Sequence, residues 1–300
     1  MPEYPDINLY LESLRPRVVG HPLERMRFFN PFVLRTVEPS PREVEGKFVE
    51  GVERIGKRIV LTMAGDVFVV IHLMIAGRLR WNDQKKETKS RGKIALAQFD
   101  FPTGALTLTE VSSHKRASVS LISGRQELQK LDPGGLDVFK VSLKAFKEKL
   151  TSENRTMKRA LTNPKWFDGI GNAYSDEILH AARLSPLRLT RSLSDVEIET
   201  LLGACRKTLA HWAQKLLDEF AGKFPGPGDV TAFRPDFAAH GKFGQPCPVC
   251  GKPIQRIRYA ENETNYCAVC QNEGRMLADR SLSRLLKDDW PKTIQEMVGD

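Results

Sequence analysis

The chain has 300 residues, enough for one to three domains with a sizeable core. Lysine and arginine outnumber aspartate and glutamate by 46 to 37, and the net charge of +9, with a pI near 9.3, favours a polyanionic partner, nucleic acid first. No apolar run reaches the ~18 residues of a membrane helix, and no positive segment precedes an apolar stretch at the start. These features argue against a membrane protein or a signal peptide and predict a cytoplasmic location.

The N-terminus reads MPEYPD, and its second residue offers particular chemistry. Removal of Met1 would give Pro2 a free secondary amine in a rigid ring, which is a candidate nucleophile. An ordinary frayed terminus is the alternative. Residues 6–14 predict a helix, because four apolar side chains share one helical face. They are Ile7, Tyr10, Leu11 and Leu14.

Strand-like runs dominate the next part of the chain. They are rich in β-branched and aromatic residues, are separated by turn residues, and cover 47–63, 68–81, 93–101 and 105–112. Residues 1–131 therefore predict one short helix and a β-sandwich. The polar, basic segment 85–93 predicts a solvated loop.

The pattern becomes helical after the breaker LDPGG at 131–135. Apolar residues recur at helical spacing at Phe139, Leu143, Phe146 and Leu150. Ser194 and Glu197 then predict the capping box of a long helix. Its core-facing residues are expected to be Ile198, Leu201, Leu202, Cys205, Leu209, Trp212 and Leu216.

The segment GIGNAYSDEILHAA (169–182) leads from two glycines into a helix. Gly169 and Gly171 flank a tight turn, and Asn172 is expected to cap the helix that follows. Glycines before a helix N-terminus let backbone N–H groups approach an anion, and the helix dipole favours negative charge there. The segment predicts a phosphate contact, with a tight polar loop that binds no ligand as the alternative.

Four of the five cysteines form two C-x2-C pairs separated by sixteen residues. This spacing is typical of a zinc ribbon, in which four thiolates close a tetrahedral shell around a structural metal ion. Disulfides are the competing interpretation, which a reducing cytoplasm disfavours. We therefore predict one structural Zn²⁺ per chain. Its ligands are Cys247, Cys250, Cys267 and Cys270.

Four blocks together resemble the formamidopyrimidine-DNA glycosylase and endonuclease VIII family of base-excision repair enzymes. They are PE-x-P at 2–5, HLMIAGRLR at 72–80, GIGNAYSDEILHAA at 169–182 and HGKFGQPCPVCGKPI…YCAVCQ at 240–271, in the family's order. The resemblance implies an α+β multidomain fold with DNA in a basic cleft. Its expected parts are an N-terminal catalytic β-sandwich domain (1–131), a helical domain with a DNA-binding helix–two-turn–helix motif (132–240), a zinc-ribbon finger (241–272) and a C-terminal extension (273–300).

The resemblance also assigns roles to single residues. It implies that the Pro2 amine attacks C1′ of the damaged nucleotide and forms a Schiff base, that Glu3 transfers protons, and that Lys57 lies near the lesion or its phosphate. An α-amine has a reference pKa near 8 against about 10.4 for lysine, so more of it is neutral and nucleophilic at pH 7. The expected DNA-binding residues are His72, Arg78, Lys115, Arg116, Lys158, Asn172 and Asn262.

The chain departs from the family where DNA is held and flipped. Asn262 stands where the ribbon hairpin carries a phosphate-clamping arginine, and asparagine brings neither the charge nor the fork. Ile75 replaces the methionine of the wedge that fills the gap left by a flipped base. In the loosely aligned segment HKRASVS (114–120), Ala117 stands where the wedge's aromatic residue is expected. These losses predict a preference for single-stranded DNA, in which base extrusion costs least.

Two functions remain open. One is a DNA glycosylase with AP (β-elimination) lyase activity on damaged bases or abasic sites, which the retained Pro2 and Glu3 favour. The other is a damaged-DNA-binding relative with little or no catalysis, which the changes at Asn262 and Ala117 favour. Either would be a monomer without membrane association, located in the cytoplasm and at the nucleoid in a bacterium. The extension is expected to cover the protein's own core with Met276, Leu277, Leu285, Leu286 and Trp290.

Overall fold

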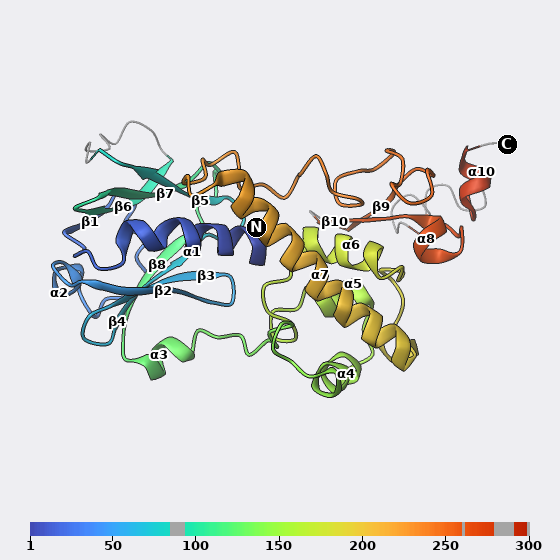
Figure 1. The fold of residues 1–300 in the computed structure, drawn as a ribbon, viewed down its shortest axis with the longest axis horizontal. Helices are drawn as coiled ribbons and strands as arrows, with labels where there is room; N and C mark the ends of the chain where they lie inside the picture. The colour runs from blue at the N-terminus through green and yellow to red at the C-terminus, as the bar shows by residue number, and fades with distance from the viewer. Residues whose placement is uncertain (85–93, 260–261, 279–290, 299–300) are drawn as a thin grey trace. The chain divides into compact units, whose positions relative to one another are not determined.

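The computed structural model of the chain describes residues 1–84, 94–259, 262–278 and 291–298 (Figure 1). The chain forms two compact units. The first contains residues 1–133 and 212–231, and the second contains residues 134–211 and 232–300. The loop predicted at 85–93 lies outside the described residues. Among the helices that are described, none is long and apolar enough to span a bilayer.

Two antiparallel four-stranded sheets form the body of the first unit and confirm the predicted sandwich. Their strand orders are β1-β6-β7-β5 and β2-β3-β4-β8. Apolar side chains from both sheets, such as Leu61, Ile71, Phe99 and Leu106, join one buried cluster. The strands are β1 Arg25–Phe28, β2 Val49–Ile55, β3 Arg58–Met63, β4 Val67–His72, β5 Gly77–Asn82, β6 Ala95–Phe101, β7 Gly104–Glu110 and β8 Ser118–Ser123.

Helix α1 (Tyr4–Val18) packs against β2 and β3. It begins after Glu3 because a capping box satisfies its first N–H groups. The Glu3 side chain accepts the Asp6 N–H, and the Asp6 carboxylate accepts the Glu3 N–H at 3.0 Å. The apolar face predicted from the sequence is buried at Ile7, Tyr10, Leu11 and Leu14. Two short helices, α2 (Pro41–Val44) and α3 (Arg125–Gln129), complete this unit.

The turn that joins β7 to β8 places Ala117 in the core. Ala117 is 2% exposed. A Cβ added to Gly77 would lie 2.9 Å from the Cβ of Ala117. The Glu110 carboxylate closes the turn by accepting the N–H groups of Arg116 and Ala117 at 2.8 and 3.0 Å. Residue 117 is therefore a tightly packed core position, and not the exposed tip that a wedge requires.

Helices and a β-hairpin form the second unit. Two of the helices, α5 (Met157–Leu161) and α6 (Asn172–Ala181), form the predicted helix–two-turn–helix motif with the turns between them. Helix α7 (Asp195–Phe220) belongs to this unit as far as His211 and to the first unit beyond it. The remaining elements are α4 (Leu143–Thr151), the 3-10 helix η1 (Thr190–Ser192), β9 (Gln255–Tyr259), β10 (Asn262–Tyr266), α8 (Ala268–Asn272) and α10 (Ile294–Val298).

The helical predictions hold for α7 and in part for α4. Glu197 accepts the Ser194 N–H at 2.8 Å, and Ser194 Oγ accepts the Glu197 N–H at 3.3 Å, which is the predicted capping box. Every predicted core residue of α7 is buried. Phe139 and Leu143 are exposed, because α4 begins only at Leu143.

The described part of the C-terminal extension packs on the ribbon hairpin. The Leu277 N–H donates to the Tyr266 hydroxyl at 2.8 Å, and the Ile294 N–H donates to Gly274 O at 2.9 Å. Tyr266, Ala268 and Ile294 form a buried cluster with Ile257, Met276 and Leu277. The extension thus covers the protein's own core at Met276 and Leu277, as predicted, whereas Leu285, Leu286 and Trp290 lie outside the described residues.

The burial of Ala117 leads to a first prediction. Ala117→Phe should lower the free energy of unfolding by about 1–3 kcal/mol, because the larger side chain overpacks the core beside Gly77. Thermal and urea unfolding would measure the change. Val111→Phe is the matched control, since Val111 lies in the same turn, is 74% exposed and should tolerate the ring. Equal stability of the two variants would contradict the core placement.

Candidate nucleic-acid site and metal centre

The first residues of the chain precede α1 in the first unit. Pro2 is buried and Glu3 is 3% exposed. Burial lowers the pKa of the Met1 amine. The Glu3 carboxylate opposes this shift, and the positive charges of Arg78 and Lys57 add to it. The surroundings therefore favour a neutral amine at this end of the chain, beside the candidate nucleophile.

Lys57 and His72 lie at the ends of neighbouring strands. Lys57 follows Gly56 in the two-residue turn between β2 and β3, and His72 ends β4 opposite Arg58. Burial, and then the charges of Arg58 and Lys57, lowers the pKa of His72 to about 4. His72 is therefore neutral at pH 7, so it can meet a phosphate as a hydrogen-bond donor but not as a cation.

Arg78 is engaged in hydrogen bonds within the first unit. Its Nε donates to Val230 O at 2.7 Å, and its Nη1 donates to Ile75 O at 3.1 Å and to Gly77 O at 2.7 Å. These bonds tie the turn between β4 and β5 to the segment after α7. Arg78 thus positions the turn that carries Ile75, and its contact with a DNA backbone stays a prediction.

Lys115 and Arg116 differ in what they can offer a ligand. The Lys115 ammonium donates to the Glu110 carbonyl. Arg116 is exposed, and its guanidinium forms no ion pair within the described part of the chain. Arg116 is therefore the better placed of the two predicted cations. Ile75, 54% exposed, lies in the turn at the same end of the sheet, because Gly77 pairs with Glu110.

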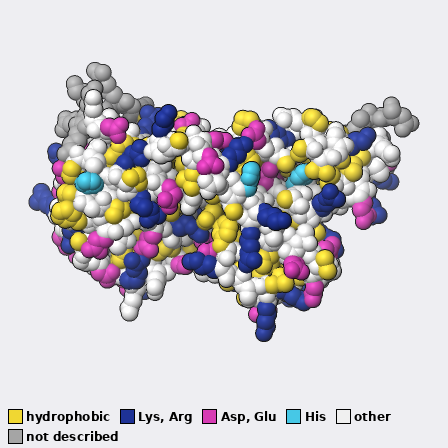
Figure 2. Space-filling view, in the orientation of Figure 1, with side chains coloured by type: hydrophobic (Ala, Val, Ile, Leu, Met, Phe, Trp, Pro, Cys, Tyr) yellow, Lys and Arg dark blue, Asp and Glu magenta, His cyan; other side chains and the backbone are white. Residues whose placement is uncertain are grey.

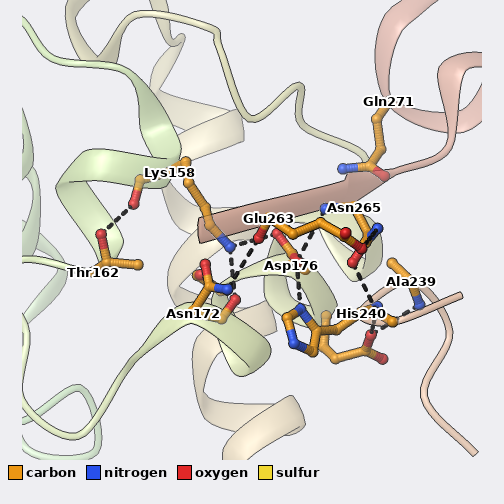
Figure 3. Close-up of polar contacts among 12 residues, drawn as sticks. Lys158, Thr162, Asn172, Asp176, Ala239, His240, Glu263, Asn265 and Gln271 are labelled. Atoms are coloured by element: carbon orange, nitrogen blue, oxygen red, sulfur yellow. Dashed lines mark hydrogen bonds and ion pairs between the residues drawn. The ribbon is translucent and has the colours of Figure 1, made fainter. Parts of the chain in front are cut away.

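In the second unit, the buried carboxylate of Asp176 connects α5, α6 and the ribbon (Figure 3). Its Oδ1 accepts from Lys158 Nζ at 2.5 Å. Its Oδ2 accepts the Asn265 N–H at 3.1 Å and lies 2.7 Å from His240 Nδ1. A carboxylate removed from water needs such partners, and here they come from three separate segments.

Lys158 and Asn172 meet at the N-terminus of α6. Lys158 Nζ donates to Asn172 O at 2.6 Å as well as to Asp176. An ammonium has three N–H donors, so one stays available beyond these two bonds with described residues. The predicted capping role of Asn172 is wrong: Gly171 is the N-cap, and Asn172 Nδ2 instead donates to Glu263 O on β10 at 3.0 Å.

Glu177 fixes the segment that leads into the ribbon. Its two carboxylate oxygens accept the N–H groups of Ala238, Ala239 and His240, each at 2.8 Å. Burial raises the pKa of Glu177, and these hydrogen bonds offset the shift only in part. Together, Asp176 and Glu177 fix both the side chain and the backbone of His240.

The four cysteines of the two C-x2-C pairs form a site for one metal ion. Their Sγ atoms all lie within 4.8 Å of one another. The Cys247–Cys270 and Cys250–Cys267 Sγ distances are 3.9 and 3.4 Å. Zinc–sulfur bonds of about 2.3 Å in a tetrahedron place the sulfurs about 3.8 Å apart, so the geometry fits one Zn²⁺. Both distances far exceed a disulfide bond of about 2.05 Å, which excludes the competing interpretation.

His180, near the end of α6, contacts the metal site. Its Nε2 lies 3.3 Å from Cys247 Sγ, and the residue is 6% exposed. Burial alone raises the pKa of the Cys247 thiol, but the His180 hydrogen bond and backbone N–H bonds outweigh it, so the pKa lies below its usual value. An N–H donated to a ligating thiolate orients the ligand and supports metal binding.

The ribbon hairpin presents two arginines from β9. Arg256 and Arg258 lie 3.5 and 3.6 Å from the Glu263 carboxylate on β10. The Arg256 guanidinium also lies 4.1 Å from the centroid of the Phe243 ring. Asn262 is the first residue of β10. Since both arginines approach one carboxylate, neither offers a phosphate a full unbalanced charge.

Three known domain families match consecutive parts of this chain. Residues 1–116 match the formamidopyrimidine-DNA glycosylase N-terminal domain, residues 135–215 the formamidopyrimidine-DNA glycosylase H2TH domain, and residues 244–272 the zinc finger found in FPG and IleRS. The formamidopyrimidine-DNA glycosylase of Thermus thermophilus is 30% identical over 283 residues, which cover 91% of this chain and 100% of the relative.

The chain belongs to the formamidopyrimidine-DNA glycosylase family.

Solved structures agree with this assignment. Lactococcus lactis formamidopyrimidine-DNA glycosylase bound non-covalently to DNA with an AP site aligns with a TM-score of 0.77 at 25% identity, over 90% of this chain and 99% of that one. The same protein with a THF-DNA and an inhibitor aligns with a TM-score of 0.78 at 27% identity, over 90% of this chain and 100% of that one. The glycosylase-family fold predicted from the four blocks is thereby confirmed.

Sequence reasoning missed Asp176, His180 and His240 as members of this site. Asp176 and His180 lie within the glycosylase-family block at 169–182, but only the apolar residues of that helix were assigned a buried face. In the structure, every residue from Ala173 to His180 is buried. The sequence signal for buried polar contacts was the adjacent pair Asp176 and Glu177 within this helix. Apart from Lys158, which lies 18 residues before Asp176, their partners lie more than 60 residues away in sequence, so no local pattern identifies them.

The contact between His180 and Cys247 leads to a prediction for the glycosylase-family ribbon. His180→Phe should speed zinc release to a colorimetric chelator, and a loss of about 10- to 100-fold in metal affinity is typical for such outer partners. His211→Phe on α7 is the control, because this exposed histidine lies outside the metal site. Release at the wild-type rate from the His180 variant would show that the hydrogen bond does not support the metal. Wild-type protein should contain about one zinc per chain.

Proposed function

We propose that this protein is a DNA glycosylase with AP lyase activity, acting on damaged bases or abasic sites with the Pro2 amine as nucleophile. One observation carries the proposal: Pro2 and Glu3 are buried together at the start of α1. The names of the relatives and the DNA in the Lactococcus lactis structures support it.

The chemistry follows from the properties of a secondary amine. After removal of Met1, the Pro2 nitrogen attacks C1′ of the damaged nucleotide, and the bond from C1′ to the base breaks. The base leaves with the electron pair of that bond and takes up a proton. Opening of the sugar ring leaves a cationic iminium between C1′ and Pro2, which withdraws electrons. Loss of a proton from C2′ then expels the 3′ phosphate and cuts the strand.

Glu3 is the group proposed to move protons at the sugar and the base. It adjoins Pro2 directly and caps the N-terminus of α1. One acceptor site of Glu3 is occupied by the Asp6 N–H. A carboxylate has about four lone-pair sites, of which this capping bond uses one.

Phosphate contacts are proposed to hold the DNA. Lysine and arginine side chains occur over both units on the face seen in Figure 2, in keeping with the net charge of +9. Lys57, His72 and Arg116 are the proposed contacts of the first unit. Lys158, Asn172 and Asn262 are those of the second. Binding of this kind weakens steeply with added salt, because each neutralised phosphate releases counterions.

A preference for single-stranded DNA is the finer part of the proposal. Ile75 is an exposed apolar side chain that can enter the gap left by a flipped base, whereas Ala117 is buried and cannot. Extruding a base costs a few kcal/mol in a duplex and least in a single strand. A short β-branched wedge leaves most of the duplex cost uncompensated.

Damaged-DNA binding without efficient catalysis is the second candidate function. It is favoured by Asn262, which lacks the charge of an arginine, and by the shared engagement of Arg256 and Arg258 with Glu263. The two candidates differ in whether a covalent intermediate forms.

Borohydride trapping on abasic DNA tests the nucleophile. The wild-type protein should form a covalent adduct, because borohydride reduces the iminium to a stable amine. Pro2→Gly should lose most of the adduct, and a form extended before Pro2 should lose all of it, since its proline nitrogen lies in a peptide bond. Affinity for uncleavable abasic DNA serves as the control and should change little. Binding without any adduct in the wild-type protein would establish the second candidate.

Strand preference is tested by single-turnover rates on one lesion at equal low salt. The rate on single-stranded or bubble DNA should exceed that on duplex. Ile75→Met should raise the duplex rate more than the single-strand rate, because methionine is longer and more flexible. Val111→Met, at an exposed position nearby, is the matched control. A duplex preference in the wild-type protein would show that another side chain acts as the wedge.

A further inference from the structure

Phe233 combines high exposure with a fixed environment. Its side chain belongs to the segment between α7 and the ribbon, and the residue is 70% exposed. The Phe233 ring stacks on the His240 ring, with the ring centroids 5.8 Å apart and an angle of 23° between the planes. A mostly exposed aromatic ring that is held in one orientation can stack on another flat group.

Gly241 permits the close approach of this ring. Its φ is +71°, a left-handed conformation that glycine adopts without strain. A Cβ added at Gly241 would lie 2.8 Å from Phe233 Cδ1. Any larger residue would therefore displace the phenylalanine from its position over His240.

The His240 ring beneath Phe233 is itself anchored. Its Nδ1 lies 2.7 Å from Asp176 Oδ2, its backbone N–H donates to Glu177 at 2.8 Å, and the Phe237 ring meets it edge-on at 6.2 Å. His240 is 5% exposed, so the lower ring of the stack belongs to the core of the second unit. The stack is therefore preorganised before any ligand arrives.

The same network links the stack to the proposed phosphate contacts. Asp176 bonds both His240 and Lys158, and Lys158 bonds the backbone of Asn172. The Asp176 carboxylate thus links Lys158, which has one further N–H donor, to the His240 ring on which the exposed Phe233 ring stacks. Aromatic rings beside cations are the elements from which single-stranded nucleic-acid sites are built.

We propose that Phe233 is a stacking platform for an unpaired nucleobase of the bound DNA. The inference rests on the proposed function and adds a base contact to it. A base stacked on Phe233 would extend the column of His240 and Phe233 by one ring, while Lys158 and Asn172 contact a phosphate of the same strand. Stacking accepts any base, so the platform would bind unpaired DNA without sequence preference.

The test uses a single-stranded oligonucleotide that carries 2-aminopurine beside a tetrahydrofuran abasic analogue. Phe233→Leu should weaken binding by about 5- to 100-fold and abolish the quenching of 2-aminopurine, because leucine cannot stack. Phe233→Trp should keep both. Phe32→Leu is the matched control: Phe32 is 76% exposed, lies in the other unit and forms no ring contact with a described residue. Wild-type affinity and quenching in Phe233→Leu would overturn the proposal.

A second measurement needs no substitution. Photocrosslinking of the wild-type protein to a strand with 5-iodouracil beside the abasic analogue should yield a crosslinked peptide that contains Phe233. Crosslinks confined to other peptides would overturn the platform. Borohydride trapping by the wild-type protein separates the two proposals. A wild-type protein that forms the adduct but does not quench 2-aminopurine refutes the platform alone, whereas a wild-type protein that gives no adduct refutes the proposed catalysis.

Discussion

The second unit depends on one buried charge. Asp176 is fully enclosed, and its carboxylate must be balanced where water cannot reach it. Lys158 supplies the counter-charge, and His240 and the Asn265 N–H occupy the other oxygen. Because a partly satisfied buried network is more costly than none, α5, α6 and the ribbon are fixed together or not at all. The residues proposed to meet DNA are therefore positioned by the same contacts that maintain the fold.

The first unit applies a comparable constraint to its N-terminus. A chain end is ordinarily mobile, but Pro2 and Glu3 are buried because Glu3 begins α1 and α1 packs on the sandwich. Capping makes the proposed proton carrier a structural residue as well. The proposed nucleophile, held in this way, would lose little freedom when a substrate binds, which is how orientation contributes to rate.

Features encoded by neighbouring residues were predictable from the sequence. The face of α1, the capping box of α7 and the two C-x2-C pairs each depend on short spacings, and the structure reproduces all three. Strand β1 was missed because it has four residues and one buried side chain. The pairs that Asp176 forms with His240 and Asn265 span 64 and 89 residues, so no sequence periodicity predicts them. Ala117 was misplaced because a loose alignment could not show that Gly77 packs against it.

The division of the chain into units has a consequence for biosynthesis. Residues 212–231 complete the first unit, where Val230 accepts from Arg78 and the Phe224 ring meets Tyr10 at 5.8 Å. The ribosome adds these residues roughly 80 to 100 positions after the first segment of this unit ends at Pro133. At 5–20 residues per second, the nascent sandwich waits about 5 to 20 seconds for its last segment. During that interval an unfinished β-domain is exposed to chaperones, and the turn that carries Ile75 lacks its final anchor.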